Sequence, residues 1–236
     1  MFAGPNGSGK STLKSVISED LLGIYINPDD IENEIKQFDF LDLRKYGVDT
    51  TADNILSFFA NSKLLERAGL QDESISLSFS DGKLSFFAVS VNAYIASVCA
   101  DFIRRELLKK RVSYTFETVM SFPDKIELLR AAKKNGYRTY LYYIATDDAA
   151  INVTRVRQRV ASGGHSVPED KIVSRYERSL SLLPSAIGET NRAYIFDNSG
   201  DASVWMCEIT DGVAVDYKQE AVPDWVYRHV VEPLSR

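Results

Sequence analysis

The chain alternates between two hydrophobic periods. Short, nearly continuous apolar runs have the length and composition of buried strands. Longer stretches repeat apolar residues every three or four positions, which is the pattern of a helix with one buried face. Strands and helices that alternate in this way predict a doubly wound, mostly parallel α/β sheet flanked by helices. The predicted strands are 23–26, 112–116, 139–145 and 193–196, and the predicted helices begin near residues 12, 28, 51, 91, 121, 149 and 166.

Helix starts and hairpins carry local signals. Ser166 and Glu169, three residues apart, predict a capping box in which the Ser166 side chain caps the next helix, with Pro168 in its first turn. Asp81-Gly82 and Asp211-Gly212 lie between alternating apolar residues and predict β-hairpins. We therefore expect one domain over residues 1–236, with an inserted hairpin at about 74–88 and a C-terminal extension of about 200–236 that contains the second hairpin.

Length and composition narrow the class of protein. With 236 residues, 44% of them hydrophobic, the chain is long enough to bury a sizeable core. A net charge of −5 argues against nucleic acid as the partner, because a coating surface for nucleic acid is basic. Cys99 and Cys207 lie among apolar residues and are expected to be buried. No apolar run approaches the roughly 20 residues of a membrane span, and no signal-peptide pattern begins the chain, so we expect a cytoplasmic protein without membrane contact.

The strongest chemical signal is the pattern G-x-x-x-x-G-K-S at residues 4–11. In such a P-loop, successive backbone N–H groups point into one concavity and hold phosphates, and the helix that follows adds its N-terminal dipole. Lys10 is expected to reach the β- and γ-phosphates, and the Ser11 hydroxyl to ligate Mg²⁺. The pattern therefore predicts a kinase-like P-loop fold that binds a nucleoside triphosphate. The predicted binding residues are Gly4, Asn6, Gly7, Ser8, Gly9, Lys10, Ser11 and Thr12.

The strand that should lead into this loop is short. Strands are typically about 5–6 residues long, and only Met1-Phe2-Ala3 precede Gly4. We expect residues in front of this numbering to contain a Val/Ile/Leu/Phe run that completes the strand and raises stability. The alternative is a short first strand in a degenerate nucleotide binder.

Polar residues follow three of the predicted strands, and ligands of open α/β sheets bind at the carboxyl ends of strands. Asp29 is the candidate general base that accepts the proton of a substrate hydroxyl, with Asp30 as the alternative. Glu117 needs a partner, and a Mg²⁺-bound water, a substrate hydroxyl or a salt bridge would serve. Asn198 is a candidate nucleotide contact.

Two arginines lie four residues apart on one flank of the helix predicted over 149–160. If Arg155 and Arg159 converge on a triphosphate, they stabilise the charge that develops during transfer. A solvated charged face is the alternative, and it is the preferred interpretation for Arg157. Gly163-Gly164 would let a segment of about 149–168 act as a lid, and His165 could touch phosphate.

Taken in order, these motifs resemble the zeta toxin family of small P-loop kinases. The Gly-Gly-His-x-Val-Pro stretch that follows the paired arginines is the most specific of them. The matching pieces are residues 3–12, 25–31, 116–118 and 154–169.

The resemblance implies that the chain uses ATP and Mg²⁺ to phosphorylate a small-molecule hydroxyl, with the 3′-hydroxyl of UDP-N-acetylglucosamine as the first candidate. It places the catalytic aspartate on Asp29, the substrate-contacting glutamate on Glu117 and one lid arginine on Arg155. Arg159 is a substitute for the second lid arginine, which in the founding toxins lies near the position of His165. A toxin of this kind would also have an antitoxin protein as partner.

The sequence leaves two alternatives to a small-molecule kinase. A polynucleotide or RNA kinase on the same scaffold would need a basic groove, which the net charge disfavours. A nucleotide-binding interaction module without group transfer would explain the short first strand and the extra hairpins.

Overall fold

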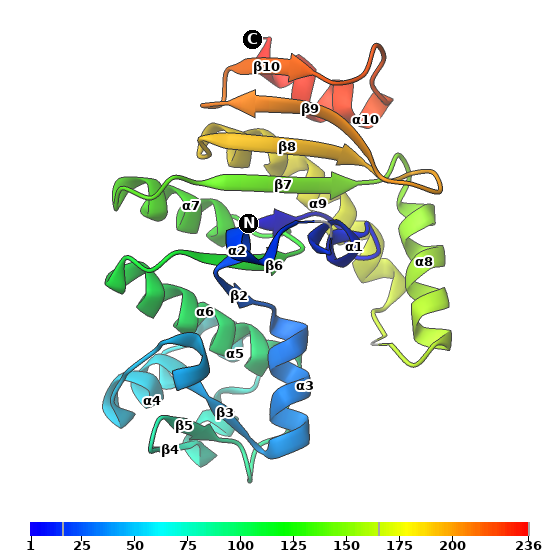
Figure 1. Ribbon diagram of the computed structural model, residues 1–236. Coiled ribbons are helices and arrows are strands. Elements are labelled where there is room, and N and C mark those ends of the chain that lie inside the picture. Colours follow the sequence, from blue (N-terminus) through cyan, green and yellow to red (C-terminus); the bar gives the residue numbers. More distant parts are fainter. Residues whose placement is uncertain (16, 165, 236) are drawn as a thin grey trace. The chain divides into compact units, whose positions relative to one another are not determined.

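The computed structural model describes residues 1–15, 17–164 and 166–235, so His165 lies outside the described residues (Figure 1). Backbone contacts group the chain into two compact units. Unit 1 comprises residues 1–21 and 117–236, and unit 2 comprises residues 22–116. The expectation of a single domain stays a prediction.

Unit 1 is built on a mostly parallel sheet. Within this unit the strand order is β10-β9-β8-β7-β1-β6. β1 pairs in parallel with β6 and β7, and β7 with β8, whereas β9 and β10 add in antiparallel orientation and form the predicted C-terminal hairpin. The strands are β1 (Phe2–Ala3), β6 (Tyr114–Thr118), β7 (Tyr140–Ala145), β8 (Arg192–Asp197), β9 (Val204–Thr210) and β10 (Ala214–Tyr217). Of β6, only residues 117 and 118 belong to unit 1.

Side chains alternate between the two faces of this sheet. On one face, buried Tyr143 of β7 places its hydroxyl 3.0 Å from Ser179 Oγ of α9, which fixes that helix against the sheet. On the other face, the rings of Phe2, Tyr142 and Tyr194 stack across three neighbouring strands with centroids 5.1 and 4.8 Å apart. The helices around this sheet are α1 (Lys10–Lys14), α7 (Asp124–Lys134), α8 (Ala149–Ala161), α9 (Glu169–Gly188), α10 (Asp224–Val226) and α11 (Glu232–Leu234).

Unit 2 contains one parallel strand pair, a small antiparallel sheet, four α-helices and two 3-10 helices, the last at Leu43–Tyr46 and Gln71–Ser76. β2 (Ile24–Ile26) pairs with the first part of β6, with Ile24 opposite Tyr114. The small sheet has the order β3-β5-β4 and includes the predicted inserted hairpin. Its strands are β3 (Phe40–Asp42), β4 (Ser78–Ser80) and β5 (Lys83–Ser85), and the helices are α3 (Pro28–Phe38), α4 (Ala52–Ala60), α5 (Lys63–Ala68) and α6 (Ala93–Lys110).

The α/β fold class is thus confirmed, with differences at helix ends. The capping box at Ser166 is wrong, because Pro168 takes the N-cap position of α9 and no side-chain cap bond forms there. The helix predicted to begin near residue 51 ends at Ala60, and a second helix that the sequence did not predict follows it, since the Ser62 side chain caps a new start at α5. In the part of the chain that the structure describes, no helix has the length and apolar character that crossing a membrane requires.

Candidate nucleotide site at the P-loop

The loop between β1 and α1 has backbone angles that favour glycine. Gly4, Gly7 and Gly9 have φ angles of 146°, 75° and 100°. A Cβ atom on Gly4 would lie 2.0 Å from the Ile144 carbonyl oxygen, and one on Gly7 would lie 2.7 Å from the Asn152 carbonyl oxygen. Glycine is therefore needed for space as well as for conformation, as a loop that brings backbone close to its surroundings requires.

Lys10, the first residue of α1, folds back on this loop. Its Nζ donates hydrogen bonds to the carbonyl oxygens of Gly4 and Pro5, each at 2.9 Å, and the residue is 8% exposed. A buried ammonium group needs such partners, because desolvation of an unpaired charge is costly. The positive charge of the lysine is therefore held beside the backbone of the P-loop.

Two asparagine side chains bond the carbonyl groups of the same loop. Asn152, on the first turn of α8, donates from Nδ2 to the Asn6 carbonyl oxygen at 2.6 Å. Asn198, directly after β8, donates from Nδ2 to the Ser8 carbonyl oxygen at 2.8 Å. The predicted site residue Asn198 thus lies against the predicted phosphate loop, and α8 reaches it as well.

Two polar side-chain atoms of the loop are buried and lack a hydrogen-bond partner among the described residues: Asn6 Oδ1 and Ser8 Oγ. Buried polar atoms are normally paired, and unpaired ones indicate a place for a ligand or another functional role. Ser11 and Thr12, on the next turn, have exposed side chains. The loop backbone requires glycine, Lys10 is held beside it, and the hydroxyl groups of Ser11 and Thr12 are exposed. These features fit a polyphosphate with its Mg²⁺.

The turn after β8 is held by a network that begins at Asp197. The Asp197 carboxylate accepts from Trp225 Nε1 at 2.7 Å and from Ser199 Oγ at 2.7 Å. The backbone N–H of Asn198 donates to the Ala145 carbonyl oxygen at the end of β7, at 2.8 Å. These bonds fix the backbone that carries the Asn198 side chain.

The three arginines of α8 differ in their contacts. Arg155 donates to the carbonyl oxygens of Asn198, at 2.7 Å, and Gly200, at 3.0 Å. Arg157 forms an exposed ion pair with Glu169 at 2.6 Å, in keeping with its predicted place on the solvated face. The Cγ atom of Arg159 lies 2.6 Å from the position that a Cβ atom on Gly164 would take, so this arginine packs beside the glycine. A phosphate contact by Arg155 or Arg159 stays a prediction.

Glu117 is an interior residue of β6, and its Cα is in register with that of Phe2 on β1. The backbone N–H of Gly4 donates to the Thr118 carbonyl oxygen at 3.3 Å, so β6 runs beside the start of the P-loop. Glu117 therefore lies within the strand next to the loop, whereas the sequence predicted that this strand ends at Phe116. Its contact with substrate stays a prediction.

Asp29 belongs to unit 2, in the first turn of α3. Asn27 is the N-cap of this helix, and its Oδ1 accepts a hydrogen bond from the Asp29 N–H at 2.9 Å. The Asp29 side chain is exposed at the carboxyl end of β2, where the sequence placed it. Asp29 and Asp30 both lie in the first turn, where a carboxylate is favoured by the helix dipole.

Sequence reasoning missed Asn152. Its side chain is fully buried, and its Oδ1 accepts a hydrogen bond from the Thr146 hydroxyl. One signal was present in the sequence: Asn152 and Val156 are four residues apart on the buried stripe of α8, and an amide on such a stripe needs partners.

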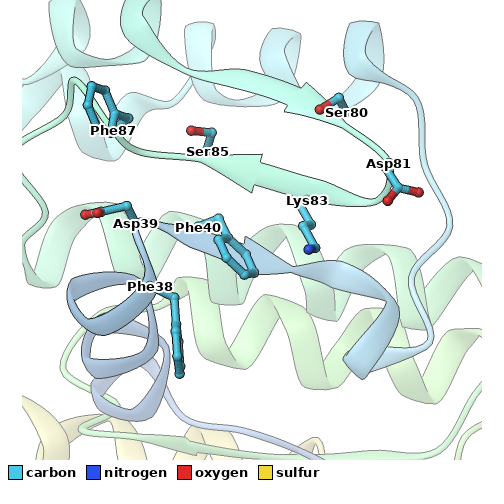
Figure 2. Close-up of a pocket in the computed structure, with 8 residues that line it drawn as sticks. All are labelled: Phe38, Asp39, Phe40, Ser80, Asp81, Lys83, Ser85 and Phe87. Carbon is cyan, nitrogen blue, oxygen red and sulfur yellow. The ribbon is translucent and has the colours of Figure 1, made fainter.

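Unit 2 carries an open pocket of about 480 Å³ on its small sheet (Figure 2). Lys83 Nζ lies 4.5 Å from the ring centre of Phe40, and the Phe87 side chain at the margin is 87% exposed. None of the predicted site residues lines this pocket. The lining residues are Phe38, Asp39, Phe40, Ser80, Asp81, Lys83, Ser85 and Phe87.

The chain is similar to a known protein family. The family model described as zeta toxin matches residues 89–210, which is more than half of the chain. The matched region contains Glu117, Arg155, Arg159 and Asn198, whereas the P-loop and Asp29 lie outside it. A Haemophilus influenzae protein described as uncharacterized is 35% identical over 69 residues, or 29% of this chain. The aligned part is 49% of that protein, so the chain spans about half the length of this relative.

Two solved structures share the fold. A crystal structure of AvrRxo1-ORF1:-ORF2 with ATP has a TM-score of 0.55 and 16% sequence identity. A crystal structure of AvrRxo1-ORF1:AvrRxo1-ORF2 with sulphate ions has a TM-score of 0.54 and 14% identity. Each likeness covers 98% of this chain and 63% of the other chain. At these identities, the likeness establishes a common fold.

Proposed function

This chain belongs to the zeta toxin family, and we propose that it is an ATP- and Mg²⁺-dependent P-loop kinase that phosphorylates a hydroxyl group of a small molecule. The observation that carries the proposal is the P-loop. Its three glycines have positive φ angles, its lysine is held beside the backbone, and its Asn6 and Ser8 side chains keep unpaired polar atoms. This combination suits a polyphosphate.

In this proposal, the loop from Gly4 to Thr12 binds the phosphates of ATP through backbone N–H groups and Lys10. The Ser11 hydroxyl is the protein ligand of Mg²⁺, which neutralises charge on the β- and γ-phosphates. The ATP-bound AvrRxo1 structure supports the choice of nucleotide, because it has the same fold.

The proposed reaction is a displacement at the γ-phosphorus. The acceptor oxygen forms a bond to that atom while the bond to the β–γ bridging oxygen breaks, and ADP leaves. The acceptor proton passes to the Asp29 carboxylate, Glu117 contacts the acceptor, and Arg155 or Arg159 stabilises the charge on the transferred group. These roles rest on the position of Asp29 after β2, on that of Glu117 in β6, on the place of the two arginines on α8 and on the family.

For the acceptor, we propose a UDP-N-acetyl sugar as the first candidate, and family membership is its support. For a partner, we propose an antitoxin protein. The two structures with the same fold each contain a second protein, ORF2, which supports a partner for this chain.

The test is a transfer assay with ATP labelled on the γ-phosphate. UDP-N-acetylglucosamine, other UDP-sugars and oligonucleotides are offered in parallel, with Mg²⁺, to the protein and to a Lys10→Ala control. Label in a UDP-sugar that disappears with Lys10→Ala supports the proposal. Label in oligonucleotides identifies a polynucleotide kinase instead, and ATP binding without a labelled product from a metabolite extract identifies a binding module.

A further inference from the structure

Two side-chain amides hold the P-loop at alternate carbonyl groups. Asn152 bonds the Asn6 carbonyl and Asn198 bonds the Ser8 carbonyl, at 2.6 and 2.8 Å. The partners are 146 and 190 residues apart in sequence, so both bonds exist only in the folded protein. Each asparagine comes from a different element, one from α8 and one from the turn after β8.

Because of the peptide geometry, each of these bonds also determines where the next N–H group points. In a trans peptide group, the C=O and the N–H that follows it point in opposite directions, and the peptide groups of this loop are trans. A carbonyl of Asn6 that faces Asn152 therefore turns the Gly7 N–H away from α8. A carbonyl of Ser8 that faces Asn198 turns the Gly9 N–H away from the turn after β8.

We propose that Asn152 is a positioning residue, which acts with Asn198 to set the directions of the Gly7 and Gly9 N–H groups for phosphate. The inference rests on the proposed function. Both residues whose N–H groups are oriented are glycines with positive φ, and glycine peptides have little conformational preference of their own. The two asparagines supply the preference that the loop sequence lacks, so that the donors are oriented before the ligand arrives.

The Asn152 amide is itself held in one orientation. Its Oδ1 accepts from the Thr146 hydroxyl, which leaves Nδ2 to face the Asn6 carbonyl. Thr146 is fully buried, and its carbonyl oxygen accepts from the Tyr176 hydroxyl of α9 at 2.6 Å. A flipped amide would set Oδ1 against the Asn6 carbonyl oxygen and lose that bond in a site without exposure to solvent, so the donor faces the loop.

The first two turns of α8 are therefore bonded to the P-loop and packed against it. A Cβ on Gly7 would also meet the Val156 side chain at 3.2 Å, so the loop lies against the second turn of the helix. Arg155 lies on the same stretch of α8 and bonds the turn that carries Asn198. Motion of a lid that includes α8 thus has to take place beyond this stretch of the helix.

The test compares Asn152→Asp with Val153→Ala. Asn152→Asp keeps the shape but replaces the donor with a carboxylate oxygen, which faces the Asn6 carbonyl. Val153 is 6% exposed and packs with Val156 and Ile172, so Val153→Ala destabilises the same helix without removing a loop bond. Binding of ADP with MgCl₂ is measured by calorimetry, and the amide resonances of Gly7 and Gly9 are followed by ¹H–¹⁵N NMR.

We expect Asn152→Asp to bind ADP about tenfold more weakly and to lose the ADP-induced shift of the Gly7 resonance. Val153→Ala should lower the Tm and keep both readouts. If Asn152→Asp does not fold, Thr146→Val replaces it, because it frees the amide to turn and should weaken ADP binding in the same sense. Asn198→Asp should remove the ADP-induced shift of the Gly9 resonance.

The outcomes separate this inference from the proposed function. Equal ADP affinity in the protein and in Asn152→Asp, or equal weakening in Asn152→Asp and Val153→Ala at equal loss of Tm, overturns the positioning role alone. Absence of ADP binding by the unsubstituted protein overturns the kinase proposal and the positioning role with it.

Discussion

The side-chain nitrogen of Asn198 lies 2.4 Å from the position that a Cβ atom would take on Gly9. The missing side chain of Gly9 is what lets the Asn198 amide reach the Ser8 carbonyl. The φ angle of 100° at Gly9 adds strain for any other residue. Gly9 and Asn198 therefore depend on each other for the shape of the loop.

Gly9→Ala is expected to weaken ADP binding by at least about tenfold, since the methyl group displaces Asn198 and the loop loses a bond. Gly136→Ala is the matched control. Its φ is also positive, at 83°, but among the described residues no atom beyond its chain neighbours lies within 4 Å of the added Cβ. It should cost about 1–2 kcal/mol of unfolding free energy from strain and leave ADP affinity unchanged. Urea denaturation and calorimetry measure the two effects. Unchanged ADP affinity in Gly9→Ala would contradict the steric argument.

Asp29→Asn is expected to lower kcat for phosphoryl transfer by about 10²–10⁴-fold, because an amide cannot accept the acceptor proton. ADP affinity should not change. The substitution keeps the Asn27 cap, since the Asp29 backbone N–H donates that bond. Asp30→Asn, one residue along the same turn, is the control. Full turnover by Asp29→Asn rejects Asp29 as the base, and a selective loss in Asp30→Asn assigns the role to that residue.

The sequence predicted those parts of the candidate site that depend on local pattern. The P-loop glycines, the aspartates after β2 and Glu117 on β6 could be placed because a strand end and a turn residue are visible in one stretch of chain. Asn198 could be placed for the same reason. Within unit 1, β1 pairs in parallel with β6 and β7, so the ends of these strands lie at one edge of the sheet.

The rest depends on contacts between distant residues. In the sequence, Asn152 is one polar residue of a predicted helix. Its role depends on the packing of α8 against the loop, which brings the Asn152 amide to the Asn6 carbonyl. The contacts of Arg155 could not be predicted for the same reason. The sequence predicts a phosphate contact for it, and in the structure it donates to two backbone carbonyl oxygens of the turn after β8. At Ser166, the predicted capping box does not form, because Pro168 with its ψ of 140° is the N-cap and α9 begins two residues later than predicted.

Trp225→Phe is expected to lower the unfolding free energy by about 1–3 kcal/mol. The indole N–H of this buried residue donates to Asp197, and phenylalanine leaves that carboxylate with one donor fewer. Tyr227→Phe, at a side chain that is 53% exposed, is the control and should change stability little. Urea denaturation measures both. Equal midpoints and slopes for Trp225→Phe and the unsubstituted protein would show that the bond to Asp197 contributes nothing.

In a chain that begins at Met1, the amino group of this residue gives a dependence of stability on pH. It donates to the Tyr140 carbonyl oxygen at 2.7 Å, and burial lowers its pKa from 8.0 to about 5. Between pH 5 and 8, the unfolded chain therefore binds a proton that the folded chain does not bind. The free energy of unfolding should rise as the pH increases from 5 to 8, because stability rises wherever the unfolded state binds more protons.

A shift of about three pKa units corresponds to about 4 kcal/mol over this range. Urea denaturation of the chain that begins with a free amine at Met1 should show this rise. The comparison is a chain in which a short Val/Ile-rich segment precedes Met1, so that an uncharged peptide N–H replaces the amine. Other groups titrate equally in both proteins, and the difference between the two curves reports the amine alone. We expect the extended chain to be more stable at pH 6 and the advantage to shrink toward pH 8. Parallel curves would show that the amine takes its proton without loss of structure, and that burial of Met1 does not oppose its charge.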